Sequence, residues 1–126
     1  MLIMPGGSRV AQARDDSAGP GLHALRSGDP VTRRLVAEAI DRLIDDGPSL
    51  GRPLVDRIAG SRLHNLKELR PGSSGASEVR ILFIFDPVRN AVLLIAGDKS
   101  GRWKEWYAEA IPAAEAAYEA YMEGRR

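Results

Sequence analysis

Two apolar runs that lie close together in the chain constrain the fold most strongly. They span residues 79–86 and 91–97, are rich in β-branched and aromatic residues, and are separated by Pro87 and Asn90, which favour a turn. Because both runs are apolar at successive positions rather than at alternate ones, we expect strands that are covered on both faces. The sequence therefore predicts an antiparallel β-hairpin in the middle of a sheet.

The predicted hairpin carries polar residues at one end. Asp98, Lys99, Ser100 and Gly101 follow the second strand, and Arg80 stands near the start of the first. Antiparallel pairing brings these positions to the same end of the sheet. We expect functional side chains at this basic, glycine-containing rim.

Composition limits the classes of function. A chain of 126 residues predicts one domain, and a net charge of +1 implies that any nucleic-acid site is local rather than spread over the surface. The absence of cysteine excludes thiolate chemistry and is compatible with the cytoplasm, where we expect the protein. His23 and His64 lack metal-ligand spacing, so we expect neither a metal nor a cofactor. We also expect no membrane association, since no apolar run has spanning length.

Helical patterns flank the hairpin. Asp29-Pro30 favours a helix start and Gly47-Pro48 a helix end, which predicts a helix over 30–46. Residues 102–109 look helical, and Pro112 predicts the start of a separate last helix. Trp103 and Trp106 are interpreted as packing residues. The residues expected to face inward are Val31, Leu35, Val36, Ala39, Ile40, Leu43 and Ile44 in the first helix, and Ala113, Ala116, Ala117, Ala120 and Tyr121 in the last.

Two shorter segments precede the hairpin. Residues 54–58 are expected to be extended, and residues 63–70 to form a strand with a bulge, because Leu66 and Leu69 break simple alternation. Residues 71–77 predict a flexible loop. The order helix, strand, strand, strand, helix contains no βαβ crossover. We therefore predict an α+β fold, in which helices pack on an antiparallel sheet.

The composition of the first residues of the chain predicts a flexible segment rather than a helix or strand. Residues 5–21 mix glycine, proline, serine and charged residues without a sustained period, and they hold too few apolar side chains to offset the entropy of ordering them. We expect residues 1–21 to form a flexible lead before a single domain at 22–126.

Strand pairing offers a structural role for several charged residues. If Arg70 lies opposite Glu78, antiparallel pairing places Glu68 opposite Arg80. Exposed cross-strand ion pairs of this kind contribute little stability, whereas an arginine buried on a central strand requires a partner. The sequence leaves open whether Arg80 is structural or catalytic.

Three segments together resemble the RelE/HigB superfamily of bacterial toxins, in particular its phage-associated HigB-like branch. They are LHNLKELR at 63–70, VRILFIFDP at 79–87, and LIAGDKSG at 94–101 followed by Trp106-Tyr107. The resemblance covers residues 31–123. It implies a small curved antiparallel sheet flanked by helices, cleavage of messenger RNA, often on the ribosome, and a cognate antitoxin, for which we expect a helix-turn-helix protein.

The start of the chain departs from this family. Members usually begin with a strand of alternating apolar and polar residues, and residues 1–21 offer no such strand. We expect the N-terminal strand to be either degenerate, with Leu2–Met4 in its place, or missing.

The resemblance also implies which residues act. Cleavage of RNA without a metal requires attack by a 2′-hydroxyl on phosphorus, neutralisation of charge on the phosphorane, and two proton transfers. By motif position, Arg80, Lys99 and Tyr107 are the catalytic candidates; Tyr107 either moves a proton or stacks on a base. The other possible proton carriers are His64 and Glu68. The candidates for RNA binding are Lys67, Arg70, Arg102 and His64.

Two alternatives to a ribonuclease stay open. The same superfamily contains toxins resembling ParE, which bind DNA gyrase without catalysis, and a degenerate member would only bind an antitoxin. Lys99, Arg102 and Tyr107 favour the ribonuclease, because a protein-binding surface does not need a basic rim beside a phenol.

Overall fold

The computed structural model describes residues 2–5, 30–72 and 78–124 of the chain. Within these residues the strands form one five-stranded sheet in the order β1-β5-β4-β3-β2, and every neighbouring pair is antiparallel. The predicted α+β fold is confirmed. The elements are β1 (Leu2–Pro5), α2 (Pro30–Asp46), the short 3-10 helix η2 (Gly47–Ser49), β2 (Val55–Arg57), β3 (Lys67–Leu69), β4 (Val79–Phe85), β5 (Asn90–Asp98) and α3 (Trp103–Glu123).

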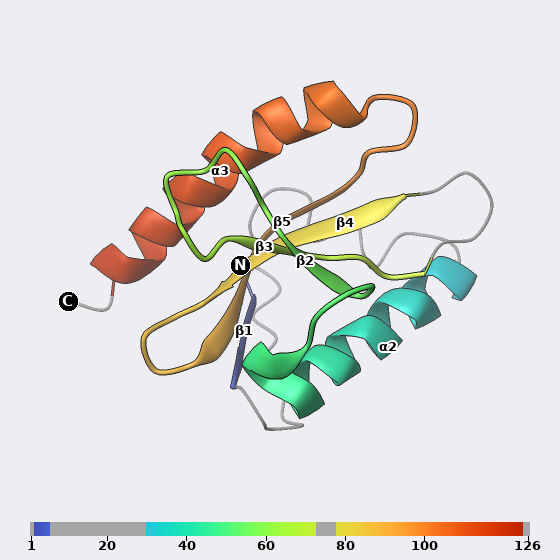
Figure 1. The fold of residues 1–126 in the computed structure, drawn as a ribbon, viewed down its shortest axis with the longest axis horizontal. Helices are drawn as coiled ribbons and strands as arrows, with labels where there is room; N and C mark the ends of the chain where they lie inside the picture. Colours follow the sequence, from blue (N-terminus) through green and yellow to red (C-terminus); the bar gives the residue numbers. More distant parts are fainter. Residues whose placement is uncertain (1, 6–29, 73–77, 125–126) are drawn as a thin grey trace.

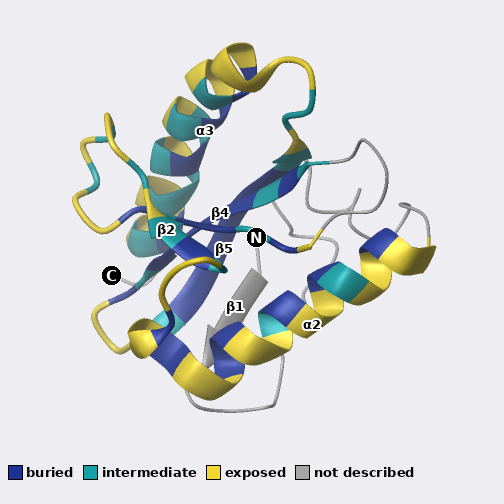
Figure 2. Cartoon of the chain, turned by 45° about the vertical axis from the view of Figure 1, so that its right-hand side comes forward, coloured by how far each residue is buried: buried dark blue, intermediate teal, exposed yellow. Residues whose placement is uncertain are grey.

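The sheet lies between the two long helices, with α2 over one face and α3 over the other (Figure 1). Alternate residues of β4 divide between the two cores: Ile81 and Phe83 pack with α2, and Leu82 and Ile84 pack with α3. Figure 2 shows that β4 and β5 are buried along most of their length. The prediction of central strands covered on both faces is therefore confirmed.

A bulge shapes the central hairpin. Leu82 pairs with Ile95 and Phe83 pairs with Leu93, so Leu94 is an extra residue on β5. As a result Leu94 and Ile95 both belong to the core beneath α3. The bulge predicted within residues 63–70 is wrong.

The segment before the central hairpin needs no bulge. Only Lys67–Leu69 form a strand, and Leu66 and Leu69 contribute to the cores on opposite faces of the sheet. Their spacing of three residues is ordinary strand alternation between the two faces, because both faces are apolar. The extended segment predicted at 54–58 is confirmed for residues 55–57, which form β2, whereas Leu54 lies in a turn.

The turn between β4 and β5 is built around the carboxylate of Asp86. Its Oδ1 accepts hydrogen bonds from the backbone N–H of Val88 at 3.0 Å and of Asn90 at 2.8 Å. Its Oδ2 accepts a hydrogen bond of 2.6 Å from the hydroxyl of Tyr121. Asp86 thus closes the hairpin and ties it to the C-terminal part of α3.

The first predicted helix is confirmed with its bounds. Val36, Ala39, Leu43 and Ile44 of α2 are buried, and Gly47 follows the helix with a φ of 60°. Val31, which was expected to face inward, is 44 % exposed. The proposed N-cap at residue 29 lies outside the described residues.

The last helix differs from the prediction. One continuous helix, α3, contains Pro112 in its interior instead of beginning there. Proline removes a backbone hydrogen bond, but Trp106 and Ala110 before it and Ala114 after it are buried against the sheet. We attribute the continuity of the helix to this packing on both sides of the proline.

The side-chain assignments on α3 are partly wrong. Ala113 and Ala117 are half-buried and Tyr121 is buried, as predicted. Ala116 and Ala120 are exposed, because the face that meets the sheet runs through Ala110 and Ala114 instead. Trp106 is buried, whereas Trp103 is 55 % exposed and is not a packing residue.

The sheet has an N-terminal edge strand. Leu2–Pro5 form β1, which pairs with β5 from Leu2 opposite Leu93 to Pro5 opposite Asn90. The alternative of a missing strand is therefore wrong, and Leu2–Met4 take its place in a strand of four residues. The rest of the predicted lead, residue 1 and residues 6–21, lies outside the described residues, as do residues 73–77 of the predicted loop.

The described helices include none that is both long enough and apolar enough to cross a membrane.

Gly97 of β5 allows α3 to approach the sheet. A Cβ atom at this position would overlap the indole of Trp106, with Cε2 only 3.0 Å away and Nε1 closer still. Trp106 is 6 % exposed. The next residue is Tyr107, whose ring packs edge to face with the indole, with 5.0 Å between the two ring centroids. The position of Tyr107 over the sheet therefore depends on the absence of a side chain at Gly97.

We predict that Gly97→Ala lowers the free energy of unfolding by about 1–3 kcal/mol, because Trp106 has to move out of a packed position. Thermal unfolding measures the loss, and tryptophan fluorescence should shift to the red as the indole becomes more exposed. Gly51→Ala is the control, since a Cβ there has no neighbour within 4 Å. Equal melting temperatures for the two variants would contradict the packing argument.

Candidate active site

A buried carboxylate on β3 organises the polar groups beneath the start of α3. Glu68 is 3 % exposed and lies on the α3 side of the sheet. Its Oε1 accepts a hydrogen bond of 2.5 Å from the hydroxyl of Tyr107. Its Oε2 accepts hydrogen bonds from Nε and Nη2 of Arg70 at 3.0 and 2.8 Å. Both oxygens are thus satisfied, one by Arg70 just after β3 and the other by Tyr107 of α3.

Arg80 of β4 stands beside the same carboxylate. Its Nε is 3.9 Å from Oε1 of Glu68, and its Nη1 donates a hydrogen bond of 2.9 Å to the carbonyl of Val79. Nε is buried and makes no hydrogen bond within the described part of the chain. A buried donor without a hydrogen bond is unfavourable. Because Nε has no hydrogen bond to lose, a small movement of Arg80 toward the oxygen of a ligand would cost little.

The predicted strand register is wrong by two residues. Glu68 pairs with Leu82 rather than with Arg80, which is a diagonal neighbour on the same face. A shift of two residues leaves every side chain on its original face, so the predicted contact between Glu68 and Arg80 survives at 3.9 Å. The pairing of Arg70 with Glu78 does not survive, since Arg70 binds Glu68 instead.

The carboxylate of Glu78 links two of the catalytic candidates, Lys99 and Arg80. Oε2 of Glu78 is 3.2 Å from Nζ of Lys99 and 3.9 Å from Nη2 of Arg80. The side chain of Glu78 is 46 % exposed, whereas those of Lys99 and Arg80 are 16 % and 15 % exposed. Two mostly buried cations therefore meet at one oxygen of a carboxylate that is half open to solvent. Through the two carboxylates the structure brings Arg80, Lys99 and Tyr107 together.

The environment of Tyr107 keeps its hydroxyl protonated. Burial raises the pKa of Tyr107, and the hydrogen bond to Glu68 and the negative charge of Glu68 raise it further. The positive charges of Arg80 and Arg70 oppose this rise but do not cancel it. The hydrogen bond to Glu68 in turn raises the pKa of Arg70. At neutral pH the phenol can act as a base only if its own proton passes on to Glu68.

The turn after β5 fixes Lys99. Oδ1 of Asp98 accepts hydrogen bonds from the backbone N–H of Glu78 at 3.0 Å and from the hydroxyl of Ser100 at 2.7 Å. Burial opposes ionisation of Asp98, but these hydrogen bonds outweigh it and lower the pKa of the carboxyl group. Gly101 completes the turn with a φ of 74°.

The four RNA-binding candidates do not gather at one place. Arg70 belongs to the cluster around Glu68, where it also lies 3.4 Å from Asp56 of β2. Arg102 stands just before α3, and its guanidinium reaches along the helix to Glu109 at 2.7 Å.

The other two candidates lie far from the rim. Lys67 faces the α2 side of the sheet, where its Nζ is 5.6 Å from the centre of the Phe85 ring. His64 is exposed and lines a hollow of about 370 Å³ with Asp86 and Pro87, at the opposite end of β4 from Arg80. The structure thus separates Lys67 and His64 from the cluster around Glu68.

Sequence reasoning undervalued the acidic residues of the site. Glu68 was named only as an alternative proton carrier and as a cross-strand partner of Arg80. Glu78 was named only as a cross-strand partner of Arg70, and Asp56 was given no role. A signal for Glu68 was present, because a carboxylate between Leu66 and Leu69 in a strand buried on both faces needs cationic or hydrogen-bonding partners. Nothing in the sequence indicates that Glu68 contacts Tyr107, because the two residues are 39 positions apart.

We predict that Tyr107 ionises at higher pH than free tyrosine. Because the pKa of Tyr107 is higher in the folded than in the unfolded protein, the protonated phenol contributes to the free energy of unfolding. This contribution is complete below the unfolded pKa of about 10 and is lost as pH rises through the folded pKa. Alkaline titration of tyrosinate absorbance, with Tyr107→Phe subtracted, isolates this group from the other two tyrosines. Glu68→Gln should lower the pKa, since the amide carries no charge. Ionisation of Tyr107 near pH 10 in the wild type would contradict the hydrogen bond to Glu68.

Comparisons with known proteins agree on one family. The family described as "Phage derived protein Gp49-like (DUF891)" matches residues 23–119. "Putative toxin HigB2" of Mycobacterium tuberculosis is 55% identical over 98 residues, which are 78% of this chain and 49% of that protein. "Putative toxin HigB3" of the same organism is 51% identical over 87 residues, which are 69% of this chain and 74% of that protein. No solved structure matches.

The chain thus spans about half the length of the first of these relatives. The family match covers α2, all of β2 to β5 and most of α3, and therefore includes both carboxylates of the site. The predicted resemblance to the phage-associated HigB-like branch is confirmed. The chain belongs to the Gp49-like family of phage-derived proteins.

Proposed function

We propose that this protein is the toxin of a type II toxin–antitoxin system and that it cleaves messenger RNA without a metal ion. The two similar proteins named as HigB toxins support the toxin assignment. The arrangement of Arg80, Lys99, Tyr107 and Glu68 supports the chemistry. Cytoplasmic messenger RNA on the ribosome is the proposed substrate.

The observation that carries the proposal is the meeting of Arg80 and Lys99 at one oxygen of Glu78. Two cations that share a carboxylate oxygen at 3.9 and 3.2 Å are spaced to share a phosphate oxygen. Glu78 is half exposed, so its side chain can turn into solvent when a phosphate arrives. The phosphate replaces the carboxylate, and the guanidinium and ammonium groups then neutralise charge as the phosphorane forms.

Tyr107 and Glu68 supply the base. The proton of the attacking 2′-hydroxyl passes to the oxygen of Tyr107 as the phenolic proton passes to Glu68 along the 2.5 Å hydrogen bond. The 2′-oxygen bonds to phosphorus, and the bond from phosphorus to the 5′-oxygen breaks. Lys99 donates the proton that the leaving oxygen needs, because arginine does not release one in a protein. The products are a 2′,3′-cyclic phosphate and a 5′-hydroxyl.

An exposed indole lies close to this chemistry along α3. Trp103 precedes Tyr107 by four residues and therefore lies on the same side of the helix, one turn earlier. It is 55 % exposed, and Nζ of Lys104 is 5.5 Å from the centre of its ring. An exposed aromatic ring beside a cation is suited to stack on an unpaired base of RNA.

A toxin of this kind requires an antitoxin. We propose that the partner is encoded by the adjacent reading frame and that it is a helix-turn-helix protein. Binding should restore growth when the two genes are expressed together.

We predict that Arg80→Ala slows cleavage about a hundredfold, which corresponds to roughly 3 kcal/mol of lost transition-state stabilisation. Arg80→Lys should recover little of the rate, since the planar fork is lost. Tyr107→Phe keeps the ring and removes the hydroxyl, and should cost about a hundredfold or more if the relay operates. Single-turnover cleavage of a short RNA measures these rates, and thermal unfolding verifies that each variant folds. Arg57→Ala, on the opposite face of the sheet, is the control.

We also predict that RNA with a 2′-deoxy sugar at the cleaved position binds but is not cut, because the nucleophile belongs to the substrate. Mapping of RNA ends should find a 2′,3′-cyclic phosphate. Normal cleavage by folded variants of Arg80, Lys99 and Tyr107 would place the chemistry elsewhere. A wild type that cuts no RNA but induces DNA damage would instead be a gyrase-binding toxin.

A further inference from the structure

The carboxylate of Glu78 lies where the proposed mechanism requires a phosphate. Its Oε2 accepts a hydrogen bond of 3.2 Å from Nζ of Lys99 and is 3.9 Å from Nη2 of Arg80. The two cationic side chains are mostly buried, whereas that of Glu78 is half exposed. An anion that binds both cations must therefore first displace this carboxylate.

Backbone hydrogen bonds hold Glu78 beside Lys99. The carbonyl of Glu78 accepts a hydrogen bond of 3.1 Å from the N–H of Lys99, and the N–H of Glu78 donates one of 3.0 Å to Oδ1 of Asp98. Only the side-chain torsions of the two residues are left to separate the carboxylate from the ammonium group. A group tethered over so short a path has an effective concentration of about millimolar or higher. A free anion of similar affinity displaces the carboxylate only above that concentration.

Glu78 fits Lys99 better than it fits Arg80. The contact of 3.2 Å with Lys99 is a hydrogen bond, but the 3.9 Å to Nη2 of Arg80 is too long for one. Nε of Arg80 also makes no hydrogen bond within the described residues, so the guanidinium is incompletely held. A phosphate group has more oxygens than a carboxylate and can accept from the guanidinium and the ammonium together. The carboxylate is therefore an imperfect occupant that a better ligand can replace.

Charge alone does not favour RNA over Glu78. An internal phosphate of RNA and the carboxylate each carry one negative charge, so the exchange leaves the net charge beside Arg80 and Lys99 unchanged. The entering ligand has to add a further contact. Trp103, exposed on the same helix as Tyr107, offers a ring on which an unpaired base can stack. A strand that reaches both the ring and the cations gains this contact, whereas a small anion does not.

We propose that Glu78 is a specificity-determining residue, a tethered competitor that keeps small anions away from Arg80 and Lys99. Single-stranded RNA enters because its phosphate and an unpaired base bind together. The inference rests on the proposed ribonuclease and deepens it by naming what selects the substrate. Glu78 transfers no proton in this scheme, so it acts on binding rather than on the chemical step.

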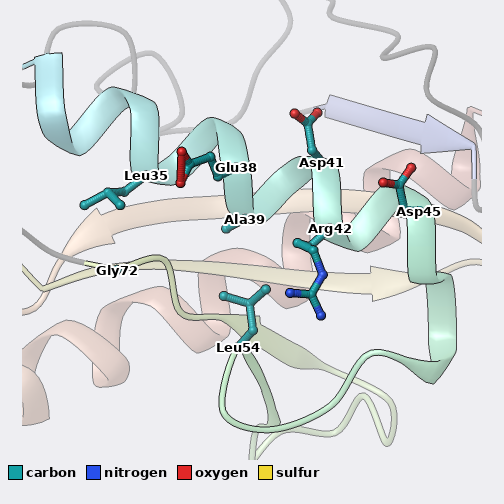
Figure 3. Close-up of a pocket in the computed structure, with 8 residues that line it drawn as sticks. All are labelled: Leu35, Glu38, Ala39, Asp41, Arg42, Asp45, Leu54 and Gly72. Carbon is teal, nitrogen blue, oxygen red and sulfur yellow. The ribbon is translucent and has the colours of Figure 1, made fainter.

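A hollow of about 480 Å³ on the α2 side of the sheet contrasts with this site (Figure 3). Its border carries Glu38, Asp41 and Asp45 with a single cation, Arg42, whose guanidinium is 3.3 Å from Oδ2 of Asp46. Because these carboxylates repel phosphate, we expect no phosphate to bind there. This hollow therefore does not interfere with a test that uses phosphate as the probe.

The first test measures the binding of inorganic phosphate to the full chain. Glu78→Gln removes the charge of the competitor and keeps its size. The matched control is Glu105→Gln, which removes one negative charge from an exposed position in the first turn of α3. The rise of Tm with phosphate concentration gives an apparent Kd for each protein.

We expect Glu78→Gln to bind phosphate at least about tenfold more tightly than the wild type and the control, because the tethered carboxylate no longer competes. Adding Lys99→Gln should remove the gain, since one of the two cations is lost. Glu78→Asp keeps the charge on a shorter side chain and should fall between the wild type and Glu78→Gln. This variant also decides the question if Glu78→Gln does not fold, because an affinity equal to that of the wild type would overturn the inference.

The second test uses cleavage of a short RNA. Removal of a competitor strengthens the binding of substrate and transition state equally, so Glu78→Gln should lower KM about tenfold and change kcat much less. Inorganic phosphate should inhibit this variant at concentrations about tenfold lower than those that inhibit the wild type. A loss of kcat without a fall in KM would show that Glu78 serves the chemical step, which overturns the inference.

The outcomes separate this inference from the proposed function. Equal phosphate affinities in Glu78→Gln, the wild type and the control overturn the inference, and RNA cleavage by the same proteins would leave the ribonuclease intact. A gain of phosphate affinity in Glu78→Gln supports the tethered competitor, and failure of every variant to cut RNA would then overturn the ribonuclease alone. A gain that is equally large in Glu105→Gln would show a general effect of net charge and would overturn the inference.

Discussion

The hydrogen bond from Tyr107 to Glu68 is the interaction on which the candidate site depends. A carboxylate that is 3 % exposed is stable only if cations or donors surround it. Arg70 just after β3, Arg80 of β4 and Tyr107 of α3 provide them. The same requirement fixes the position of the phenol over the sheet. Gly97 makes this arrangement possible, because it lets Trp106 bring the start of α3 close to β5. Packing and charge pairing therefore select the same position for Tyr107.

The charges of the site balance one another. Arg80 and Lys99 are held by Glu68 and Glu78, so two mostly buried cations remain compensated and ordered. Glu68 is enclosed and stays in place, whereas Glu78 is half exposed and can leave. In the mechanism that we propose, this difference in exposure lets an entering phosphate replace Glu78 while Glu68 keeps the rest of the cluster in place.

Sequence reasoning found the elements whose causes are local. The apolar runs at 79–86 and 91–97 and the apolar stripe of α2 define their elements without reference to the rest of the chain. The predictions were wrong where contacts between distant segments determine the structure. The register of β3 against β4 differs by two residues, and the packing of Trp106 and Ala114 carries α3 through its internal proline. The candidates Arg80, Lys99 and Tyr107 were found by resemblance, but the carboxylates that join them depend on contacts between distant segments.

A double-mutant cycle between Glu68 and Tyr107 in single-turnover cleavage tests the account most directly. If the phenol and the carboxylate act as one relay, Glu68→Gln should slow cleavage in the wild type and have little further effect in Tyr107→Phe, so that the double variant is about as slow as Tyr107→Phe alone. If the two losses multiply, the residues act independently, and the hydrogen bond between them is structural rather than catalytic.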